Sequence, residues 1–255
     1  MIAVLRSAAF TLSFYLASVV IVVTALPLLI LPRGLTVAGC RFWSKLTLWL
    51  LRICAGVTYE IRGLEHLPDT PCLIASKHQS MWDTVAATAL LDDPAMVLKK
   101  ELLLIPFYGW YAQKMGMIAI DRQAGAAAIR NLSARAKRAL GQGRSLVIYP
   151  EGTRTAPGER LEYKPGVAAL YRQLKLPCVP VAVNSGRYWP KSGFLKRPGT
   201  IVMEFLPPIP AGLDRKSFMT RLQTDIETAT AQLLLEAEGV RSDRGPSAPR
   251  ADAAQ

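Results

Sequence analysis

The hydrophobic and polar positions divide the chain into an apolar N-terminal part and a longer part in which short apolar runs alternate with amphipathic segments. Residues 7–32 carry no charge, are dense in Leu, Val, Ile and Ala, and are interrupted by Pro27. A helix needs about 20 apolar residues to cross a hydrocarbon core of roughly 30 Å. A cleaved signal peptide fits less well, because the apolar region is long and no small-residue cleavage site follows it. The segment therefore predicts a retained anchor that spans the bilayer or lies in one leaflet.

Residues 39–56 give a second membrane signal. At 100° per residue, Arg41, Lys45 and Arg52 fall on one side of a helix. Large apolar side chains occupy much of the remaining circumference: Phe42, Trp43, Leu46, Trp49, Leu50 and Ile53. This pattern predicts an interfacial amphipathic helix with a cationic stripe. The alternative is a helix that docks on the protein core with its charges outward.

From residue 57 onward the pattern is that of an α/β domain. Short apolar or alternating runs predict strands at residues 57–61, 72–76, 95–98, 116–122, 145–149, 179–183 and 200–205. Helices are expected at residues 81–91, 124–140, 167–174 and 214–238. The alternation predicts a mixed, largely parallel sheet flanked by helices. The expected organisation is a membrane-associated region at 1–56, a catalytic domain at 57–238 and a disordered tail at 239–255.

The charge balance indicates an anionic partner. The 255 residues include 31 Lys and Arg against 19 Asp and Glu, which gives a net charge of +12. Nucleic acid and an anionic lipid surface both fit this balance. A hydrophobic content of 51% and a mean hydropathy of +0.21 favour membrane lipids over nucleic acid. The four cysteines show no C-x-x-C spacing, so no metal site is expected.

The distribution of basic residues around the apolar segment predicts its orientation. Arg6 precedes the segment, whereas Arg33, Arg41, Lys45 and Arg52 follow it. By the positive-inside rule, the chain after the segment lies in the cytoplasm. The expected location is the inner membrane, with the α/β domain on its cytoplasmic face.

His78 and Asp83 form the strongest candidate for chemistry. His78 follows the predicted strand at 72–76, and Asp83 lies in the first turn of the helix at 81–91, with Ser80 as a candidate N-cap. A His-Asp pair can act as a general base on a hydroxyl group of the substrate. No G-x-S-x-G motif supplies a protein serine nucleophile. The alternative is that Asp83 only caps its helix and His78 is a surface loop residue.

A second candidate site follows the strand at 145–149. The loop holds Glu151, Gly152, Thr153 and Arg154 in consecutive positions. Arg154 can donate two hydrogen bonds to a phosphate, and Gly152 permits close approach of the backbone. Arg122, at the end of another predicted strand, supplies a second positive charge. Taken alone, either arginine could be a solvated loop charge; together they predict an anion site.

These motifs resemble a known family. H-x-x-x-x-D at 78–83, Ile-Asp-Arg at 120–122, Pro-Glu-Gly-Thr-Arg at 150–154 and Val-Pro-Val at 179–181 occur in the order and spacing of the four motif blocks of the glycerolipid acyltransferases. The likeness is greatest to the bacterial 1-acyl-sn-glycerol-3-phosphate acyltransferases and covers residues 57–205. Tyr149 stands where the family often has Phe.

The resemblance implies a glycerol-3-phosphate acyltransferase-like fold and direct acyl transfer to the sn-2 hydroxyl of lysophosphatidic acid. The donor would be acyl-CoA or acyl carrier protein, the product phosphatidic acid, and no cofactor would be needed. His78, oriented by Asp83, would be the base. The implied acceptor-binding residues are Arg122, Glu151, Gly152, Thr153 and Arg154, and Lys100 is a candidate for the oxyanion or donor thioester region.

Two other functions remain open. Relatives that acylate another lysolipid, such as lyso-ornithine lipid, share all four motif blocks. A basic membrane-binding protein without catalysis would also explain the charge. It would give no reason, however, for His78, Asp83 and the Glu151 loop to occur together.

Overall fold

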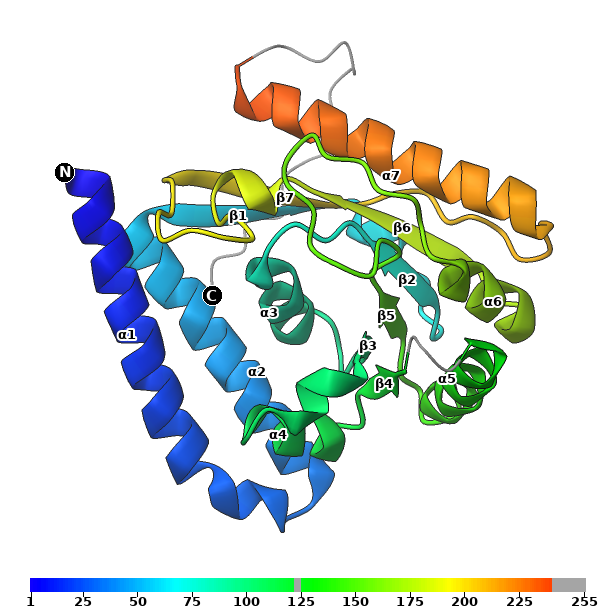
Figure 1. Cartoon of the computed structure of the whole chain (residues 1–255), viewed down its shortest axis with the longest axis horizontal. Helices are drawn as coiled ribbons and strands as arrows, with labels where there is room; N and C mark the ends of the chain where they lie inside the picture. Colours follow the sequence, from blue (N-terminus) through cyan, green and yellow to red (C-terminus); the bar gives the residue numbers. More distant parts are fainter. Residues whose placement is uncertain (122–124, 240–255) are drawn as a thin grey trace.

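Seven strands form one sheet at the centre of the computed structural model, which describes residues 1–121 and 125–239 (Figure 1). Their order across the sheet is β1-β7-β6-β2-β5-β3-β4. All paired strands are parallel except β6 and β7, which are antiparallel. The strands are β1 (Val57–Arg62), β2 (Leu73–Ser76), β3 (Ala95–Lys99), β4 (Ile118–Ile120), β5 (Leu146–Ile148), β6 (Cys178–Val183) and β7 (Gly199–Phe205).

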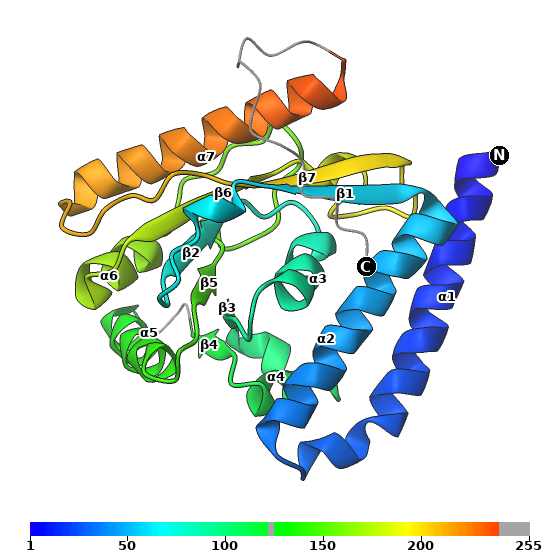
Figure 2. The same ribbon diagram turned by 180° about the vertical axis from the view of Figure 1, so that it is seen from behind.

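Helices cover both faces of the sheet, as Figures 1 and 2 show from opposite sides. On one face lie α3 (Met81–Leu90) and the N-terminal helices; on the other lie α5 (Gly125–Leu140), α6 (Pro165–Leu174) and α7 (Arg215–Ala237). Strand β2 is buried on both faces. Ile74 packs into the core on the α3 side of the sheet, and Leu73 and Ala75 pack into the core on the side of α5, α6 and α7. A strand that is buried on both faces needs apolar side chains at successive positions, so its sequence is an unbroken apolar run.

Helix α3 begins immediately after the segment that carries His78. Ser80 accepts a hydrogen bond from the Trp82 backbone N–H at 3.1 Å, and Asp83 accepts one from the Ser80 backbone N–H at 2.9 Å. This reciprocal pair is a capping box. The cap fixes where the helix starts and therefore fixes the direction in which the chain leaves β2.

The N-terminal residues form an antiparallel helical hairpin on the α3 side of the sheet (Figure 1). It comprises α1 (Ile2–Thr24), the 3-10 helix η1 (Leu26–Leu29) and α2 (Arg33–Leu50), followed by a π-helical turn, η2 (Leu51–Ala55). Helix α1 ends before Pro27 because proline has no N–H to donate to the carbonyl group four residues earlier, and its ring clashes with that carbonyl. The helices thus begin earlier than the segments expected at 7–32 and 39–56.

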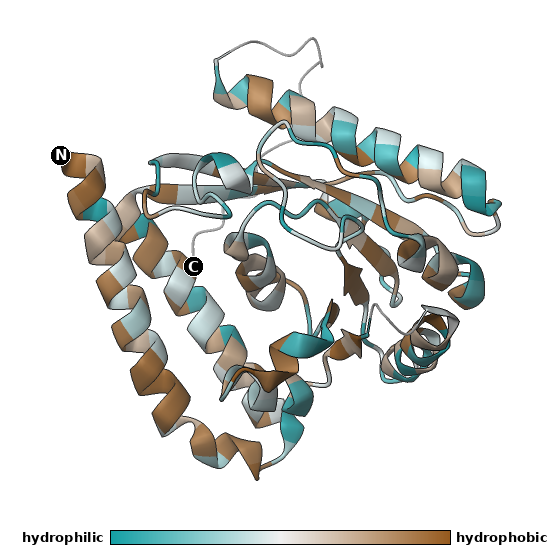
Figure 3. Ribbon diagram, viewed as in Figure 1, coloured by the Kyte–Doolittle hydropathy of each residue, from teal (hydrophilic) through white to brown (hydrophobic). Residues whose placement is uncertain are grey.

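Helix α1 has the length and composition of a membrane span. Its most apolar stretch has a mean hydropathy of 1.9, and only 11% of that stretch is buried in the protein. Figure 3 shows the strongest hydrophobic colour of the hairpin in the later turns of α1 and in η1, with paler residues in the middle of α1. A signal sequence near an N-terminus has the same length and composition. Helix α1 is therefore a candidate for membrane association.

The expected fold class is confirmed, and the predicted strands and helices of the α/β region are found within a few residues of their expected limits. Helix α4 (Tyr108–Lys114) and the preceding 3-10 helix η4 (Lys100–Leu104) were not predicted. Their aromatic residues and Gly109 show no helical period. Gly109 is required because a Cβ there would lie 2.0 Å from the Leu103 carbonyl oxygen. Arg122 and residues 240–255 of the tail expected at 239–255 lie outside the described residues.

Candidate active site

The candidate site lies where three neighbouring parallel strands end. Strand β2 pairs with β5 on one side and with β6 on the other. The carboxyl ends of parallel strands lie at the same edge of a sheet, which is where α/β proteins place their ligands. His78 follows β2, the Glu151 loop follows β5, and Ser185 follows β6. The topology therefore brings three segments far apart in the sequence to one place.

His78 and Asp83 are in direct contact. The His78 Nδ1 atom lies 2.8 Å from Asp83 Oδ2. A carboxylate only accepts hydrogen bonds, so Nδ1 carries a proton, and in the neutral imidazole Nε2 then holds the free lone pair. The Asp83 side chain is fully buried, whereas that of His78 is 15% exposed. The imidazole is thus held by a buried charge on one side and is accessible from outside, as a general base requires.

Asp83 serves the helix and the imidazole at once. Oδ2 accepts from His78 Nδ1, from the Gln79 backbone N–H at 2.7 Å and from the Ser80 backbone N–H. Oδ1 accepts from the Ser185 hydroxyl. A buried carboxylate needs such donors to offset the loss of its hydration. The capping role and the orienting role of Asp83, which the sequence posed as alternatives, coexist in this geometry.

Tyr149 forms one wall of the site. Its ring stacks on the His78 imidazole with centroids 4.1 Å apart and an angle of 24° between the ring planes. Burial raises the pKa of the Tyr149 hydroxyl well above its usual value, and the charge of Asp83 adds to the effect. The phenol therefore stays neutral, and its ring covers one face of the imidazole.

The Glu151 loop holds the backbone of His78. Glu151 Oε2 accepts from the His78 N–H at 3.0 Å, and the Thr155 N–H donates to the His78 carbonyl oxygen at 2.8 Å. The other Glu151 oxygen contacts Lys77 at 2.7 Å and the Thr155 hydroxyl at 3.2 Å. Burial raises the pKa of Glu151, and Lys77 opposes this rise. Both oxygens of this expected substrate-binding residue are thus occupied by protein donors.

A buried ion pair connects the same loop to the last helix. The Lys77 side chain is 1% exposed, and its ammonium lies 2.7 Å from Glu227 Oε1 on α7. The Tyr163 hydroxyl donates to the same oxygen at 2.9 Å. Lys77 is therefore shared between Glu151 and Glu227, and it joins the candidate site to α7.

Several residues of the site were not identified from the sequence: Lys77, Tyr149 in its stacking role, Thr155, Ser185 and Glu227. Ser185 has a usable signal, since it closely follows the predicted strand at 179–183, and residues at strand ends gather at such sites. Lys77 directly precedes His78 at the end of an apolar run. Glu227 has no comparable signal, because its contact with Lys77 joins positions 150 residues apart.

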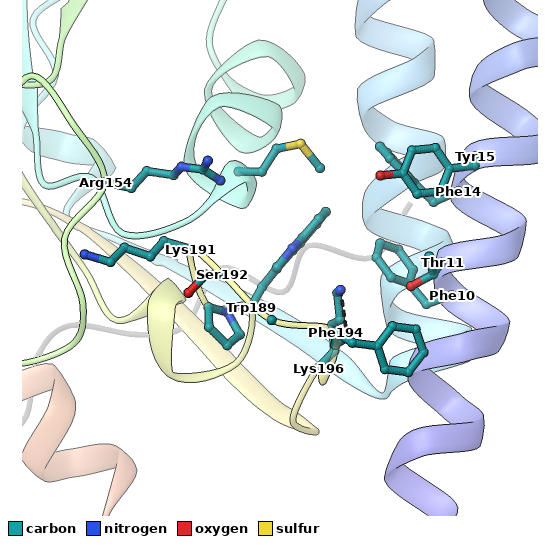
Figure 4. Close-up of a pocket in the computed structure, with 13 residues that line it drawn as sticks. Phe10, Thr11, Phe14, Tyr15, Arg154, Trp189, Lys191, Ser192, Phe194 and Lys196 are labelled. Carbon is teal, nitrogen blue, oxygen red and sulfur yellow. Dashed lines mark hydrogen bonds between the residues drawn. The ribbon is translucent and has the colours of Figure 1, made fainter.

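The other residues expected to bind phosphate are more exposed than Glu151. Gly152 has a φ of +70°, which glycine adopts without strain, and both Thr153 and Arg154 are exposed. Arg154 has no hydrogen bond or ion pair with any other residue in the described part of the chain. Its side chain lines a pocket of about 340 Å³ that also reaches Met81, at the start of α3 (Figure 4).

Lys100 lies at the start of η4 and does not line this pocket. Its side chain is 64% exposed, and its ammonium lies 3.1 Å from a carboxylate oxygen of Asp121, the residue that precedes Arg122. Within the described residues, no group of three or more His, Cys, Asp or Glu side chains is arranged to hold a metal ion. The site that the structure describes consists of the His78 imidazole, the buried carboxylates of Asp83 and Glu151, and the exposed guanidinium of Arg154.

Known proteins resemble this chain in sequence. The model of the family described as Acyltransferase matches residues 58–184. The chain is 38% identical over 194 residues to a 1-acyl-sn-glycerol-3-phosphate acyltransferase of Pseudomonas aeruginosa, covering 76% of each protein. It is 32% identical over 181 residues to the 1-acyl-sn-glycerol-3-phosphate acyltransferase alpha of Mus musculus, and the match covers 69% of this chain and 63% of the relative.

A solved structure has the same fold. The crystal structure of the 1-acyl-sn-glycerophosphate (LPA) acyltransferase, PlsC, from Thermotoga maritima superposes with a TM-score of 0.72. The match covers 89% of this chain and 97% of that one, at 20% sequence identity. At this identity the likeness establishes the fold alone.

Proposed function

The chain belongs to the acyltransferase family, and from this premise we propose that it acylates the sn-2 hydroxyl of lysophosphatidic acid to form phosphatidic acid. The acyl donor is a thioester, either acyl-CoA or acyl carrier protein. The observation that carries the proposal is the 2.8 Å contact between His78 and Asp83 at the strand ends, beside the exposed Arg154. The names of the relatives support the choice of acceptor.

His78 acts as the general base. The proton of the sn-2 hydroxyl passes to Nε2 while the hydroxyl oxygen attacks the thioester carbonyl carbon. The carbon–sulfur bond then breaks, and the imidazolium returns the proton to the departing sulfur. Asp83 stabilises the imidazolium because its carboxylate is buried and held by its own donors. General-base assistance of this kind contributes about 10²- to 10⁴-fold.

Arg154 binds the phosphate of the acceptor, assisted by Gly152 and Thr153. Its guanidinium is exposed and can donate two parallel hydrogen bonds to phosphate oxygens. We further propose that Arg122 adds another positive charge and that Lys100 serves the oxyanion or the donor thioester. We assign Glu151 to holding His78 rather than to touching the acceptor, because its oxygens already accept from Lys77, Thr155 and the His78 backbone.

The helical hairpin holds the site at the cytoplasmic face of the inner membrane. Large apolar side chains are exposed along it, among them Leu12, Leu16, Val19, Val20, Phe42 and Trp49. Contacts to the rest of the protein run the length of α1, from Ser7, bonded to Lys196, to Val22, bonded to Tyr111. A helix attached at both ends cannot project away from the domain, so α1 lies in one leaflet.

A panel of acceptors tests the proposal. Purified protein is incubated with radiolabelled acyl-CoA or acyl carrier protein and with lysophosphatidic acid, lyso-ornithine lipid, lysophosphatidylcholine or monoacylglycerol. We expect kcat/KM to be highest for lysophosphatidic acid. A higher value for lyso-ornithine lipid would overturn the choice of acceptor. Vesicle binding without acyl transfer to any acceptor would favour the non-catalytic membrane-binding protein.

A further inference from the structure

The pocket beside Arg154 joins the candidate active site to the membrane hairpin. Its lining comes from three places: the first half of α1, the start of α3 with the neighbouring Arg154, and the segment between η5 (Ser185–Arg187) and β7, which spans residues 189–196. Figure 4 shows Arg154 on one side of the space and the aromatic side chains of α1 on the other. No aspartate or glutamate lines it.

Lys196 is the unusual member of this lining. The residue is only 8% exposed, and its ammonium has no carboxylate partner among the described residues. It donates to the Phe194 carbonyl oxygen at 2.9 Å and lies 5.8 to 5.9 Å from the ring centroids of Phe10, Trp189 and Phe194. Figure 4 shows the ammonium pointing into the space between Trp189 and Phe10.

A buried cation without a counter-ion is costly. Burial lowers the pKa of the Lys196 ammonium, which reflects the lost hydration. Aromatic rings at nearly 6 Å offset only part of this cost. A second buried group in the lining also lacks a partner in the described part of the chain, the hydroxyl of Thr11 on α1. Both groups would gain a partner from a ligand that carries hydrogen-bond acceptors and a negative charge.

Lys191, the other lysine of the lining, is paired with Glu159 at 3.0 Å. The aromatic part of the lining is continuous with the hairpin. Phe10 and Phe14 stack at 5.8 Å, and each contacts the Trp189 ring edge-on. An anion with no apolar part would not use this wall. A single-chain amphiphile with an anionic headgroup would use both parts of the pocket.

The pocket also adjoins the base. Met81, which lines it, lies three residues after His78 and starts the helix that holds Asp83. Arg154 directly precedes Thr155, which hydrogen-bonds to the His78 carbonyl oxygen. A headgroup in the pocket therefore lies next to the segment that carries the imidazole.

We propose that this pocket binds the headgroup of the anionic lysolipid acceptor, with Lys196 as a second cation opposite Arg154 and with Phe10 and Phe14 against the start of the acyl chain. The proposal rests on the proposed function, since it concerns the acceptor of the same reaction. Lys196 is then a residue that determines preference for an acceptor with a charged phosphate. The 189–196 segment, α1 and Arg154 together form the acceptor site.

The test compares Lys196→Gln with Arg197→Gln in neutral detergent micelles. Arg197 is adjacent and exposed and does not line the pocket, so its substitution removes the same charge without touching the site. For Lys196→Gln we expect KM for lysophosphatidic acid to rise roughly tenfold or more, as for the loss of a charged contact. The KM for the acyl donor and kcat should change less than twofold. Arg197→Gln should resemble wild type.

The outcomes separate this proposal from the one on which it rests. If the wild-type protein does not acylate lysophosphatidic acid, the proposed function fails. If it does and Lys196→Gln leaves the acceptor KM unchanged, the pocket proposal fails. The proposal also fails if the variant loses only affinity for vesicles that contain phosphatidylglycerol, because the occupant would then be a bulk membrane lipid.

A second variant keeps the test decisive if Lys196→Gln does not fold. Ser192 lines the pocket from an exposed position. Ser192→Trp should fill the space without disturbing the core and should raise the acceptor KM by at least roughly tenfold. An unchanged KM in this variant contradicts the proposal.

Discussion

Asp83 stabilises the start of α3 and orients His78 through the same oxygen, Oδ2, while Oδ1 accepts from Ser185. The two effects depend on different partners. The cap also needs the Ser80 hydroxyl, whereas the imidazole needs only the carboxylate. Substitutions at Ser80 and Asp83 therefore separate stability from catalysis.

Ser80→Ala should lower the free energy of unfolding by about 1 kcal/mol, as is typical for loss of an N-cap, and leave kcat within about threefold of wild type. Asp83→Asn should reduce kcat by a factor on the order of 10³ to 10⁴, because an amide cannot stabilise the imidazolium in the same way. Urea denaturation and steady-state kinetics in detergent measure the two effects. Equal losses of kcat in both variants would show that the cap alone accounts for the role of Asp83.

The residues of the site were predictable to the extent that they are local. His78, Asp83 and Ser80 lie within six positions, so spacing alone indicates their contact. Ser185 meets Asp83 across 102 positions, and this contact depends on β6 pairing with β2. Spacing along the chain carries no information on such a pair until the strand order is known.

At the scale of elements, Lys77 connects three of them. Its ammonium contacts Glu151 in the loop after β5 and Glu227 on α7, while its backbone continues β2. Removing one partner of a buried ion pair leaves an uncompensated charge and costs roughly 3–5 kcal/mol. Lys77→Met should therefore destabilise the protein by about this amount.

The loss of stability in Lys77→Met should depend on pH. Burial already raises the pKa of Glu151, and removal of Lys77 removes a group that opposes the rise. Above the pKa of an unfolded glutamate, about 4.3, the folded protein then binds more protons than the unfolded one. Stability must fall as pH rises through that window, and it must fall further in Lys77→Met than in wild type.

Urea denaturation at several values between pH 5 and 8 measures this difference. Glu227 also loses the Lys77 ammonium in Lys77→Met, so Lys77→Met/Glu227→Gln isolates the effect of Glu151. The double variant should keep the steeper fall of stability with rising pH. Parallel pH profiles for wild type and both variants would contradict the assignment of Lys77 as the group that opposes the rise in the pKa of Glu151.

The elements themselves were largely predictable, because the central strands are buried on both faces and appear as apolar runs, as at Leu73 to Ala75. Helix α4 was not, because its packing depends on Tyr111 reaching the Val22 carbonyl oxygen of α1. A contact with a distant helix, rather than a period in the local sequence, stabilises it. The limits of α1 were set by Pro27 rather than by where the apolar residues end.

At the scale of the whole molecule, the hairpin and the sheet edge meet at the pocket of Figure 4. One side of α1 packs on the domain, and the other exposes Leu16 and Val20. If that exposed side contacts lipid, charges placed there should weaken membrane binding without affecting the fold.

Leu16→Glu/Val20→Glu should reduce the partition onto anionic vesicles at least roughly tenfold, since each buried aliphatic side chain contributes about 1.5–3 kcal/mol. Activity in detergent micelles should change little. Leu64→Glu/Leu235→Glu is the matched control, because both residues are exposed and lie outside the hairpin. Vesicle sedimentation measures the partition. Equal losses in the two double variants would mean that the hairpin is not the membrane-binding surface.

The measurement that tests the central claim most directly is the rate of acyl transfer to lysophosphatidic acid by wild type, His78→Ala and His66→Ala. His66 is the control because it is the other histidine and bonds the Phe205 carbonyl oxygen, outside the candidate site. The account predicts that His78→Ala lowers kcat by at least about 10²- to 10⁴-fold. His66→Ala should retain a rate within a few fold of wild type. A His78→Ala enzyme that works at the wild-type rate would contradict the role of His78 as the base.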